Sequence, residues 1–181
     1  MTRIEELLER LDPFEVITKR QIRKKLPEGG EWDDEPDGLF WKDKATGVFC
    51  IVARNHGGAL CGYAGVTKEH QWFRVNYSGD RDKPWGERGV TPECVIEAHG
   101  GLTFSDSMRG DSVWFFGFDC SHLYDLSPSH DRSTGMDTYR NLFYVVREVE
   151  SMARQLAANS GEQPPEPQSQ GPQQSQKDVT K

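Results

Sequence analysis

The strongest pattern of apolar and polar positions lies near the C-terminal end of the chain. From residue 139 to residue 156, apolar residues recur at steps of three and four, which is the spacing of one face of an α-helix. Charged residues mostly occupy the other side of this stretch. The pattern predicts an amphipathic helix of about five turns that packs on a sheet, with Asp137 or Thr138 as its N-cap. Gly161 follows the expected end of the helix, where helices commonly stop.

The N-terminal part of the chain carries two shorter helical patterns. The first places four apolar residues on one face: Ile4, Leu7, Leu8 and Leu11. Thr2 is its expected cap, and Pro13 should end it because proline disfavours helix at the residue before it. A second helix is expected over residues 14–26, and it carries the cations Lys19, Arg20, Arg23, Lys24 and Lys25. We interpret this basic cluster as a solvated helix face, which the acidic run at residues 33–37 could pair with.

Between residues 38 and 119, short apolar runs separated by turn residues indicate β-strands. The runs at 39–41 and 48–52 flank a polar loop and predict a hairpin. Further strands are expected at 59–66, 95–104 and 113–119, with an exposed loop at 78–92. Too few residues separate the strands for helical crossovers, so the sheet should be antiparallel. The pattern predicts an α+β fold of about five strands, packed by the long C-terminal helix and by the N-terminal helices.

These elements divide the chain into three parts. We expect an N-terminal helical segment at residues 1–30, an α+β core domain at 31–158 and a tail at 159–181. The tail contains six Gln, four Pro and a single apolar residue, Val179. So few apolar groups cannot offset the entropy cost of ordering a backbone, and the tail is therefore expected to be disordered.

Composition limits the functional classes. The chain has 181 residues, with 22 Lys and Arg against 29 Asp and Glu and a net charge of −7. Such a chain lacks the clustered positive charge of a general nucleic-acid-binding protein. It has no apolar run long enough for a membrane span, and its first residues lack the apolar stretch of a signal peptide. We therefore expect a cytoplasmic protein, in which the four cysteines, with no Cys-x-x-Cys pair, are thiols.

Polar residues crowd the end of the apolar strand expected at 113–119. This strand leads into Asp119, Cys120, Ser121, His122 and Asp125. A buried strand that ends in titratable groups holds them on a rigid base, where they can face a cleft. In the preceding expected strand, His99 is followed by Gly100 and Gly101, and paired glycines imply a bulge or the close approach of another backbone or a ligand. If the two strands are neighbours, His99 comes near this cluster.

Two catalytic chemistries fit these residues. A zinc site would use the ligands Cys61, His99, Cys120 and His122, with Asp125 as an alternative ligand. A thiol enzyme would use Cys120 as nucleophile, His99 or His122 as base, and Asp119 or Asp125 as the orienting carboxylate. The amides of the glycine pair could then form an oxyanion hole.

A binding pocket is the third possibility. Its polar groups would hydrogen-bond a small ligand such as a nucleotide, and an aromatic side chain would offer a stacking face. The candidate ligand-binding residues are Gly100, Gly101, Thr103, Asp119, Tyr63 and Trp114.

Four segments occur in an order that resembles a known family. They are LCGYAGV at 60–66, HGGLTF at 99–104, WFFGFDCSH at 114–122 and the pair Tyr139-Arg140 before the last expected helix. Over residues 32–157 the chain resembles a family of small proteins encoded by tailed phages and by bacterial genomes, especially actinobacterial ones. Relatives often carry a longer insert with further Cys and His where this chain has the loop 105–112, which weakens a metal site that relies on the insert. No activity is established for the family, so the resemblance implies a genomic setting and no mechanism.

These observations lead to one hypothesis with two alternatives. We expect a phage-type accessory protein, acting in host takeover or anti-defence, whose polar cleft binds a small molecule such as a nucleotide, or a host protein. The cleft would be formed by His99, Cys120, His122 and Asp125. One alternative is a zinc- or thiol-dependent hydrolase that uses the same residues as catalytic groups. The other is a purely structural interaction module.

Overall fold

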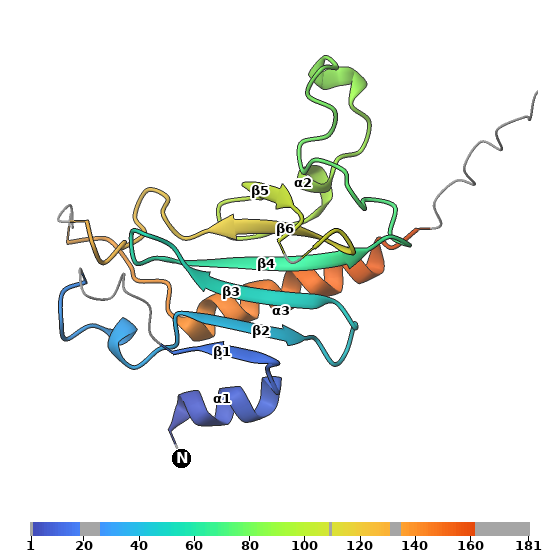
Figure 1. Cartoon of the computed structure of the whole chain (residues 1–181). Helices are drawn as coiled ribbons and strands as arrows, with labels where there is room; N and C mark the ends of the chain where they lie inside the picture. Colours follow the sequence, from blue (N-terminus) through green and yellow to red (C-terminus); the bar gives the residue numbers. More distant parts are fainter. Residues whose placement is uncertain (1, 19–25, 109, 131–134, 162–181) are drawn as a thin grey trace, which may run out of the picture.

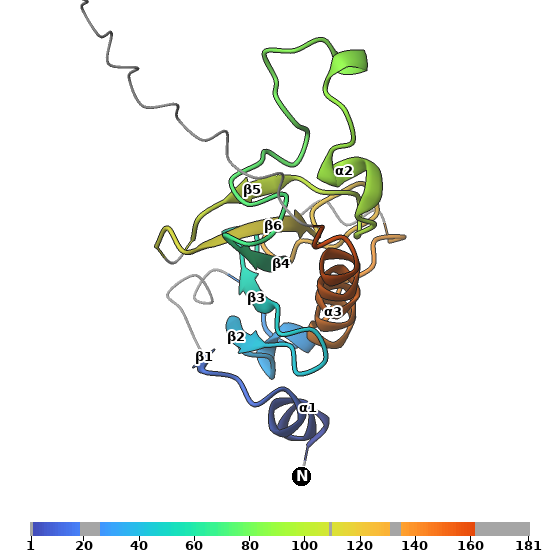
Figure 2. The same cartoon turned by 90° about the vertical axis from the view of Figure 1, so that its right-hand side faces the viewer.

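The described residues form one antiparallel sheet with a long helix across one face. The computed structural model of the chain describes residues 2–18, 26–108, 110–130 and 135–161. Within them, six strands follow the order β1-β2-β3-β4-β6-β5, and helix α3 packs against the sheet (Figures 1 and 2). The expected α+β class is confirmed.

The strands and helices occupy the following positions. The strands are β1 (Glu15–Ile17), β2 (Gly38–Lys42), β3 (Phe49–Arg54), β4 (Leu60–Thr67), β5 (Phe104–Asp106) and β6 (Val113–Asp119). The helices are α1 (Arg3–Leu11), α2 (Pro92–Val95) and α3 (Leu142–Ala158), with short 3₁₀ turns η2 (Glu31–Asp33) and η3 (Trp85–Glu87). The expected hairpin is the β2–β3 pair, and the expected strands at 59–66 and 113–119 are β4 and β6, which lie side by side.

Helix α3 covers the centre of the sheet with its apolar face. Its buried side chains are Leu142, Val145, Val146, Val149, Met152, Ala153 and Leu156. Gly62 of β4 lies beneath this face, and a Cβ atom there would come 2.5 Å from Cγ2 of Val149. The glycine therefore permits the close approach of helix and strand. The N-cap is Asn141 rather than Asp137 or Thr138, because the Asn141 side chain accepts the backbone N–H of Tyr144 at 3.1 Å.

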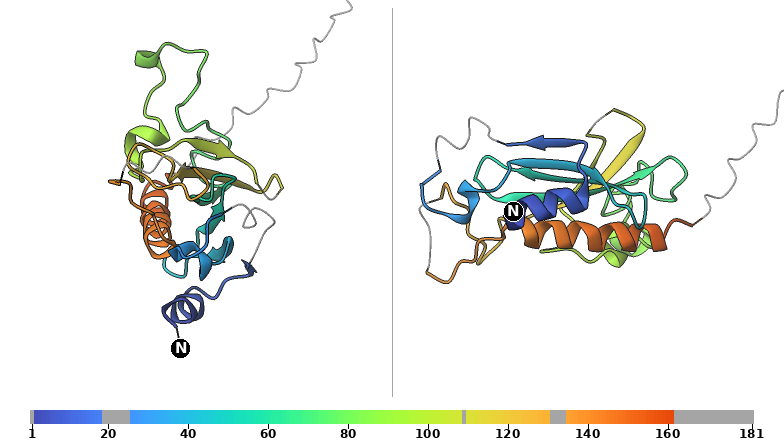
Figure 3. Two further views of the ribbon diagram at one scale, coloured as in Figure 1. Left: turned by 90° about the vertical axis from the view of Figure 1, so that its left-hand side faces the viewer. Right: turned by 90° about the horizontal axis from the view of Figure 1, so that it is seen from below.

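The N-terminal segment contributes to the same core. Helix α1 begins with the expected cap, a capping box in which Thr2 and Glu5 bond each other's backbone N–H groups. Its Leu7 and Leu11 are buried, and α1 lies beside α3 in Figure 3. The prediction of a second helix from residue 14 is wrong at its start. Glu15–Ile17 forms β1, which pairs with β2 at the edge of the sheet. The basic cluster at 19–25 and the tail from 162 lie outside the described residues.

The strand expected at 95–104 is also wrong, and the reason lies in its glycines. Gly100 and Gly101 both have positive φ, at 68° and 87°, and the N–H of Gly101 closes a turn onto the carbonyl of Ala98 at 2.9 Å. Two successive residues in this region cannot continue a strand. The chain therefore turns after α2, and pairing with β6 begins only at Phe104. His99 lies on this turn rather than in the sheet.

One further feature stands out from the sheet. The part of the chain around η3, between β4 and α2, projects away from it, whereas Trp72 at the start of this connection packs in the core (Figures 1 and 2). This connection includes the exposed loop expected at 78–92. No helix in the described ranges has both the length and the apolar character needed to cross a membrane.

Candidate functional site

A polar cluster forms where β6 ends and the chain returns to start α3. His99 comes from the turn after α2, and His122 and Asp125 come from the loop that follows β6. Arg140 precedes α3, and Tyr144 lies in the first turn of that helix. The antiparallel sheet and the covering helix thus bring together groups from three separate parts of the chain.

Asp125 is the centre of this cluster. Its side chain is 1% exposed, and its Oδ2 accepts hydrogen bonds from Nε2 of His99 at 2.7 Å and from the backbone N–H of His122 at 3.1 Å. Its Oδ1 accepts a hydrogen bond from Nε of Arg140 at 2.8 Å. Burial by itself raises the pKa of Asp125, but the hydrogen bonds from His99, Arg140 and the His122 backbone outweigh burial and lower that pKa. Asp125 is therefore an ionised acceptor at neutral pH.

His99 is fixed from both sides of its ring. One nitrogen, Nε2, bonds Asp125, and the other, Nδ1, lies 2.8 Å from the hydroxyl of Tyr144. The rings of His99 and Tyr144 are nearly perpendicular, with centroids 5.5 Å apart. The side chain of His99 is 12% exposed. Its orientation is therefore set by the surrounding protein.

His122 occupies the space left by a glycine. A Cβ atom on Gly100 would lie 2.2 Å from Cε1 of His122, so the imidazole packs directly on the glycine backbone. The sequence led us to expect another backbone or a ligand close to the glycine pair, whereas here a side chain, the ring of His122, approaches Gly100. Gly101 differs, since nothing lies within 4 Å of a Cβ there and its N–H is used by Ala98, so it offers no free amide for an oxyanion hole. The ring of His122 also packs edge-on against His99, with centroids 5.4 Å apart.

A cleft of about 510 Å³ opens beside this cluster. It is lined by Ser121, His122, Leu123, Tyr124, Asp125, Leu126, Ser127, His130 and Asp137. Leu123 and Tyr124 are 80% and 51% exposed. Tyr124 has φ of 70°, an uncommon conformation for a residue with a side chain, and its carbonyl is held by the N–H of Thr138 at 2.9 Å. The loop therefore presents an apolar and aromatic surface beside His122.

The cysteines do not take the expected places. Cys120 is 1% exposed and packs in the core, and burial, followed by the charge of Asp125, raises the pKa of its thiol. Burial likewise raises the pKa of the Cys61 thiol to about 11. A nucleophilic thiol needs access and a lowered pKa, so this is the opposite environment. Among the described residues, the group with metal-ligand spacing consists of His99, His122 and Asp125, and neither cysteine belongs to it.

The remaining candidate ligand-binding residues are not among those that line the cleft. The hydroxyl of Thr103 donates to Asp119 at 3.1 Å, and the other carboxylate oxygen of Asp119 accepts the N–H of Ser121. Tyr63 packs edge-on against Phe104, and Trp114 donates its indole N–H to the carbonyl of Val75. These contacts give the four residues structural roles in the described part of the chain.

Sequence reasoning missed two members of the cluster, Arg140 and Tyr144. Arg140 was noted within a motif without a role, and Tyr144 was not singled out. A second polar group was also missed: Arg54, fully buried, bonds Asp37, Glu35 and the Tyr139 hydroxyl at 2.8, 3.0 and 2.7 Å. Tyr139 and Arg140 are adjacent in sequence, so this buried network and the Asp125 cluster share one segment. The acidic run at 33–37 thus supplies carboxylates to the core.

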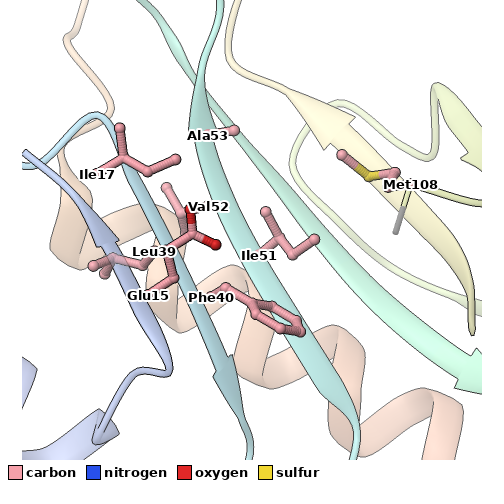
Figure 4. Close-up of a pocket in the computed structure, with 8 residues that line it drawn as sticks. All are labelled: Glu15, Ile17, Leu39, Phe40, Ile51, Val52, Ala53 and Met108. Carbon is pink, nitrogen blue, oxygen red and sulfur yellow. The ribbon is translucent and has the colours of Figure 1, made fainter. Parts of the chain in front are cut away.

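A second, smaller hollow lies on the sheet itself. It measures about 170 Å³, and Figure 4 shows side chains such as Phe40, Ile51 and Met108 around it. The lining is mainly apolar, with Glu15 at the edge strand. It therefore lacks the convergent polar groups found beside His122.

Comparisons with protein-family models, with curated proteins and with solved structures find no match for this chain.

Proposed function

We propose that the cleft beside His122 binds a small molecule with an anionic group and a planar ring, of the nucleotide class. The observation that carries this proposal is the fixed position of His122 at the cleft wall. Gly100 packs against the ring of His122, and the backbone N–H of His122 donates a hydrogen bond to the buried carboxylate of Asp125. A recognition group that is already ordered loses little entropy when it binds a ligand.

The size and lining of the cleft suit such a ligand. A volume of about 510 Å³ lies within the range of small-molecule sites. His122 and His130 offer imidazole nitrogens, and Ser121 offers a hydroxyl, to an anionic group. The exposed ring of Tyr124 offers a face on which a planar base can stack. The sequence pattern resembles a family of proteins that phages encode, and a phage protein of this kind would sequester its ligand.

Binding of adenosine monophosphate (AMP) by isothermal titration calorimetry tests the proposal. His122→Ala removes the recognition group, and Tyr124→Asn removes the ring while keeping a residue that tolerates positive φ. His56→Ala, an exposed histidine that does not line the cleft, is the matched control. We expect AMP affinity to fall about tenfold or more in the first two variants, because stacking and charge-assisted contacts each contribute about 1–3 kcal/mol. The control should bind like the wild type.

Adenosine and inorganic phosphate, titrated separately, show which part of the ligand is recognised. We expect each to bind more weakly than AMP, since each engages one side of the cleft. Equal AMP affinity in the wild type, His122→Ala and Tyr124→Asn would contradict the proposal. The proposal would also be contradicted if no ligand binds the wild type and the variants only lose thermal stability. That result is expected of a structural module.

A further inference from the structure

We propose that His99, His122 and Asp125 form a binding site for one divalent transition-metal ion. The ligand atoms would be Nε2 of His99, Nδ1 of His122 and Oδ2 of Asp125. One ligand atom from each residue lies within 4.8 Å of the others. The inference goes beyond nucleotide binding and does not require it, because the site is complete in the protein's own side chains.

Nδ1 of His122 is placed to bind an ion. This nitrogen is buried, and among the described residues it has no hydrogen-bond partner. It lies 3.5 Å from Oδ2 of Asp125, which is too long for a good hydrogen bond. Two ligands at about 2.1 Å from a tetrahedral ion are about 3.4 Å apart. The two atoms are therefore spaced as ligands of a common ion.

His99 is the second ligand, and its Nε2 donates a hydrogen bond to Asp125. When Nε2 binds a metal, its proton must leave that nitrogen, and Nδ1 must carry the proton of the neutral ring. Nδ1 lies 2.8 Å from the hydroxyl of Tyr144, which can donate to it before metal binding and accept from it afterwards. The hydroxyl of Tyr144 can thus bond Nδ1 in either tautomer of the ring. Its Nε2 has to move from 2.7 Å to ligand spacing from Oδ2.

Neighbouring residues hold the proposed ligands in place. Arg140 binds Oδ1 of Asp125, so the other oxygen, Oδ2, is the one beside the two imidazoles, and Gly100 packs against the ring of His122. Such outer contacts orient ligands and raise affinity about 10- to 100-fold. His122 and Asp125 also line the cleft, so an exchangeable ligand can reach the open coordination position from there.

The ligand set indicates the class of metal. Two imidazoles and one carboxylate suit Zn²⁺ and Fe²⁺, whereas Mg²⁺ prefers a shell of six oxygens. Both ions share the chemistry that this site offers, and titration with each distinguishes them. This ligand set replaces the two-cysteine set expected from the sequence.

The test is metal binding to the untagged full chain after treatment with a chelator. Zn²⁺, anaerobic Fe²⁺ and Mg²⁺ are titrated separately by calorimetry, and Co²⁺ is added to follow the visible absorption of its coordination sphere. His122→Ala is the principal variant, because it leaves the His99–Asp125–Arg140 contacts in place. His130→Ala is the matched control: it removes another histidine of the same cleft that lies outside the ligand group.

We expect one equivalent of Zn²⁺ or Fe²⁺ to bind the wild type and His130→Ala equally. Binding should weaken about 100-fold or more in His122→Ala, and the Co²⁺ absorption of a nitrogen- and oxygen-ligated ion should disappear. No binding of Zn²⁺ or Fe²⁺ to the wild type, Mg²⁺ binding of equal strength, or equal affinity in His122→Ala would overturn the inference. Titration of AMP into the metal-free protein separates the two proposals, because AMP binding without metal binding removes the metal site alone.

Discussion

The imidazole of His122 lies where a side chain on Gly100 would be, with Cε1 at 2.2 Å from the position of a Cβ atom. Gly100 belongs to the turn that follows α2, and His122 belongs to the loop that follows β6. The contact therefore joins two parts of the chain that are separated by strands β5 and β6. It also explains why a glycine occurs at position 100, whereas at Gly101 only the positive φ favours glycine.

Replacing this glycine should displace the histidine. Gly100→Ala introduces both a Cβ at φ of 68° and a clash with the ring, whereas Gly101→Ala introduces a Cβ at φ of 87° with nothing within 4 Å. The left-handed conformation alone costs about 1–2 kcal/mol for a residue with a Cβ. We expect Gly101→Ala to lose about that much in urea unfolding, and Gly100→Ala to lose more and to shift the His122 ring signals in NMR spectra. Equal losses with unchanged His122 signals would show that the contact is unimportant.

Asp125 should make the stability of the protein depend on pH. Its pKa is lowered in the folded state, so its contribution to stability is fully present above the unfolded pKa, near 3.8, and is lost as the pH falls through the folded pKa. Asp125→Asn leaves Arg140 and His99 without their carboxylate, and we expect a loss of about 3 kcal/mol at pH 7. The difference between wild type and variant should shrink below pH 4 in urea unfolding.

Asp111→Asn is the control for this experiment. Asp111 is exposed in the loop between β5 and β6, and its replacement should change the free energy of unfolding by less than about 0.5 kcal/mol. If Asp125→Asn and Asp111→Asn change the free energy of unfolding by the same amount at every pH, the cluster does not hold the loop after β6 in place.

The buried network around Arg54 should affect stability without affecting the cleft. Tyr139→Phe removes a hydroxyl that bonds both Arg54 and Glu35, at an expected cost of about 1–2 kcal/mol. Arg54→Met leaves two carboxylates in the core without their guanidinium, at about 3–5 kcal/mol. Unfolding by urea measures both, and AMP and Zn²⁺ titrations should match those of the wild type in Tyr139→Phe. Lost binding in this variant would mean that the two networks act as one.

Thiol reactivity tests the alternative of a cysteine enzyme. Cys94 is exposed, whereas Cys50, Cys61 and Cys120 are buried, and burial raises the pKa of each buried thiol. An aromatic disulfide reagent at pH 7.5 should therefore modify one thiol rapidly in the native protein, and Cys94→Ser should abolish that phase. A rapid phase that persists in Cys94→Ser and disappears in Cys120→Ser would restore Cys120 as a candidate nucleophile.

The regular parts of the fold could be predicted because their patterns are local. The helical stripe of α3, the Thr2 cap of α1 and the apolar runs of β2, β3, β4 and β6 each appear within a short stretch of sequence. The failures occur where tertiary contacts decide the conformation. Residues 15–17 form a strand because β2 offers an edge, and the expected strand at 95–104 gives way to a turn at two glycines of positive φ.

The candidate site shows the same division. His99, His122 and Asp125 could be selected because a buried strand and a glycine pair lead to them. That Cys120 does not belong to the site could not be predicted. Its side chain points into the core, and a shift of one residue in the strand register would reverse that direction. The roles of Arg140 and Tyr144 could not be predicted from the sequence either, because their contacts depend on where α3 lies against the sheet.

The most direct test of the proposed cleft follows the five histidines of the chain at once. In a protein labelled with ¹⁵N-histidine, side-chain NMR spectra report His56, His70, His99, His122 and His130 separately. Titration with AMP should shift the signals of His122 and His130, which line the cleft, and leave those of His56 and His70 in place. Unchanged signals for His122 at saturating AMP, or equal shifts for all five histidines, would contradict the assignment of this cleft as the ligand site.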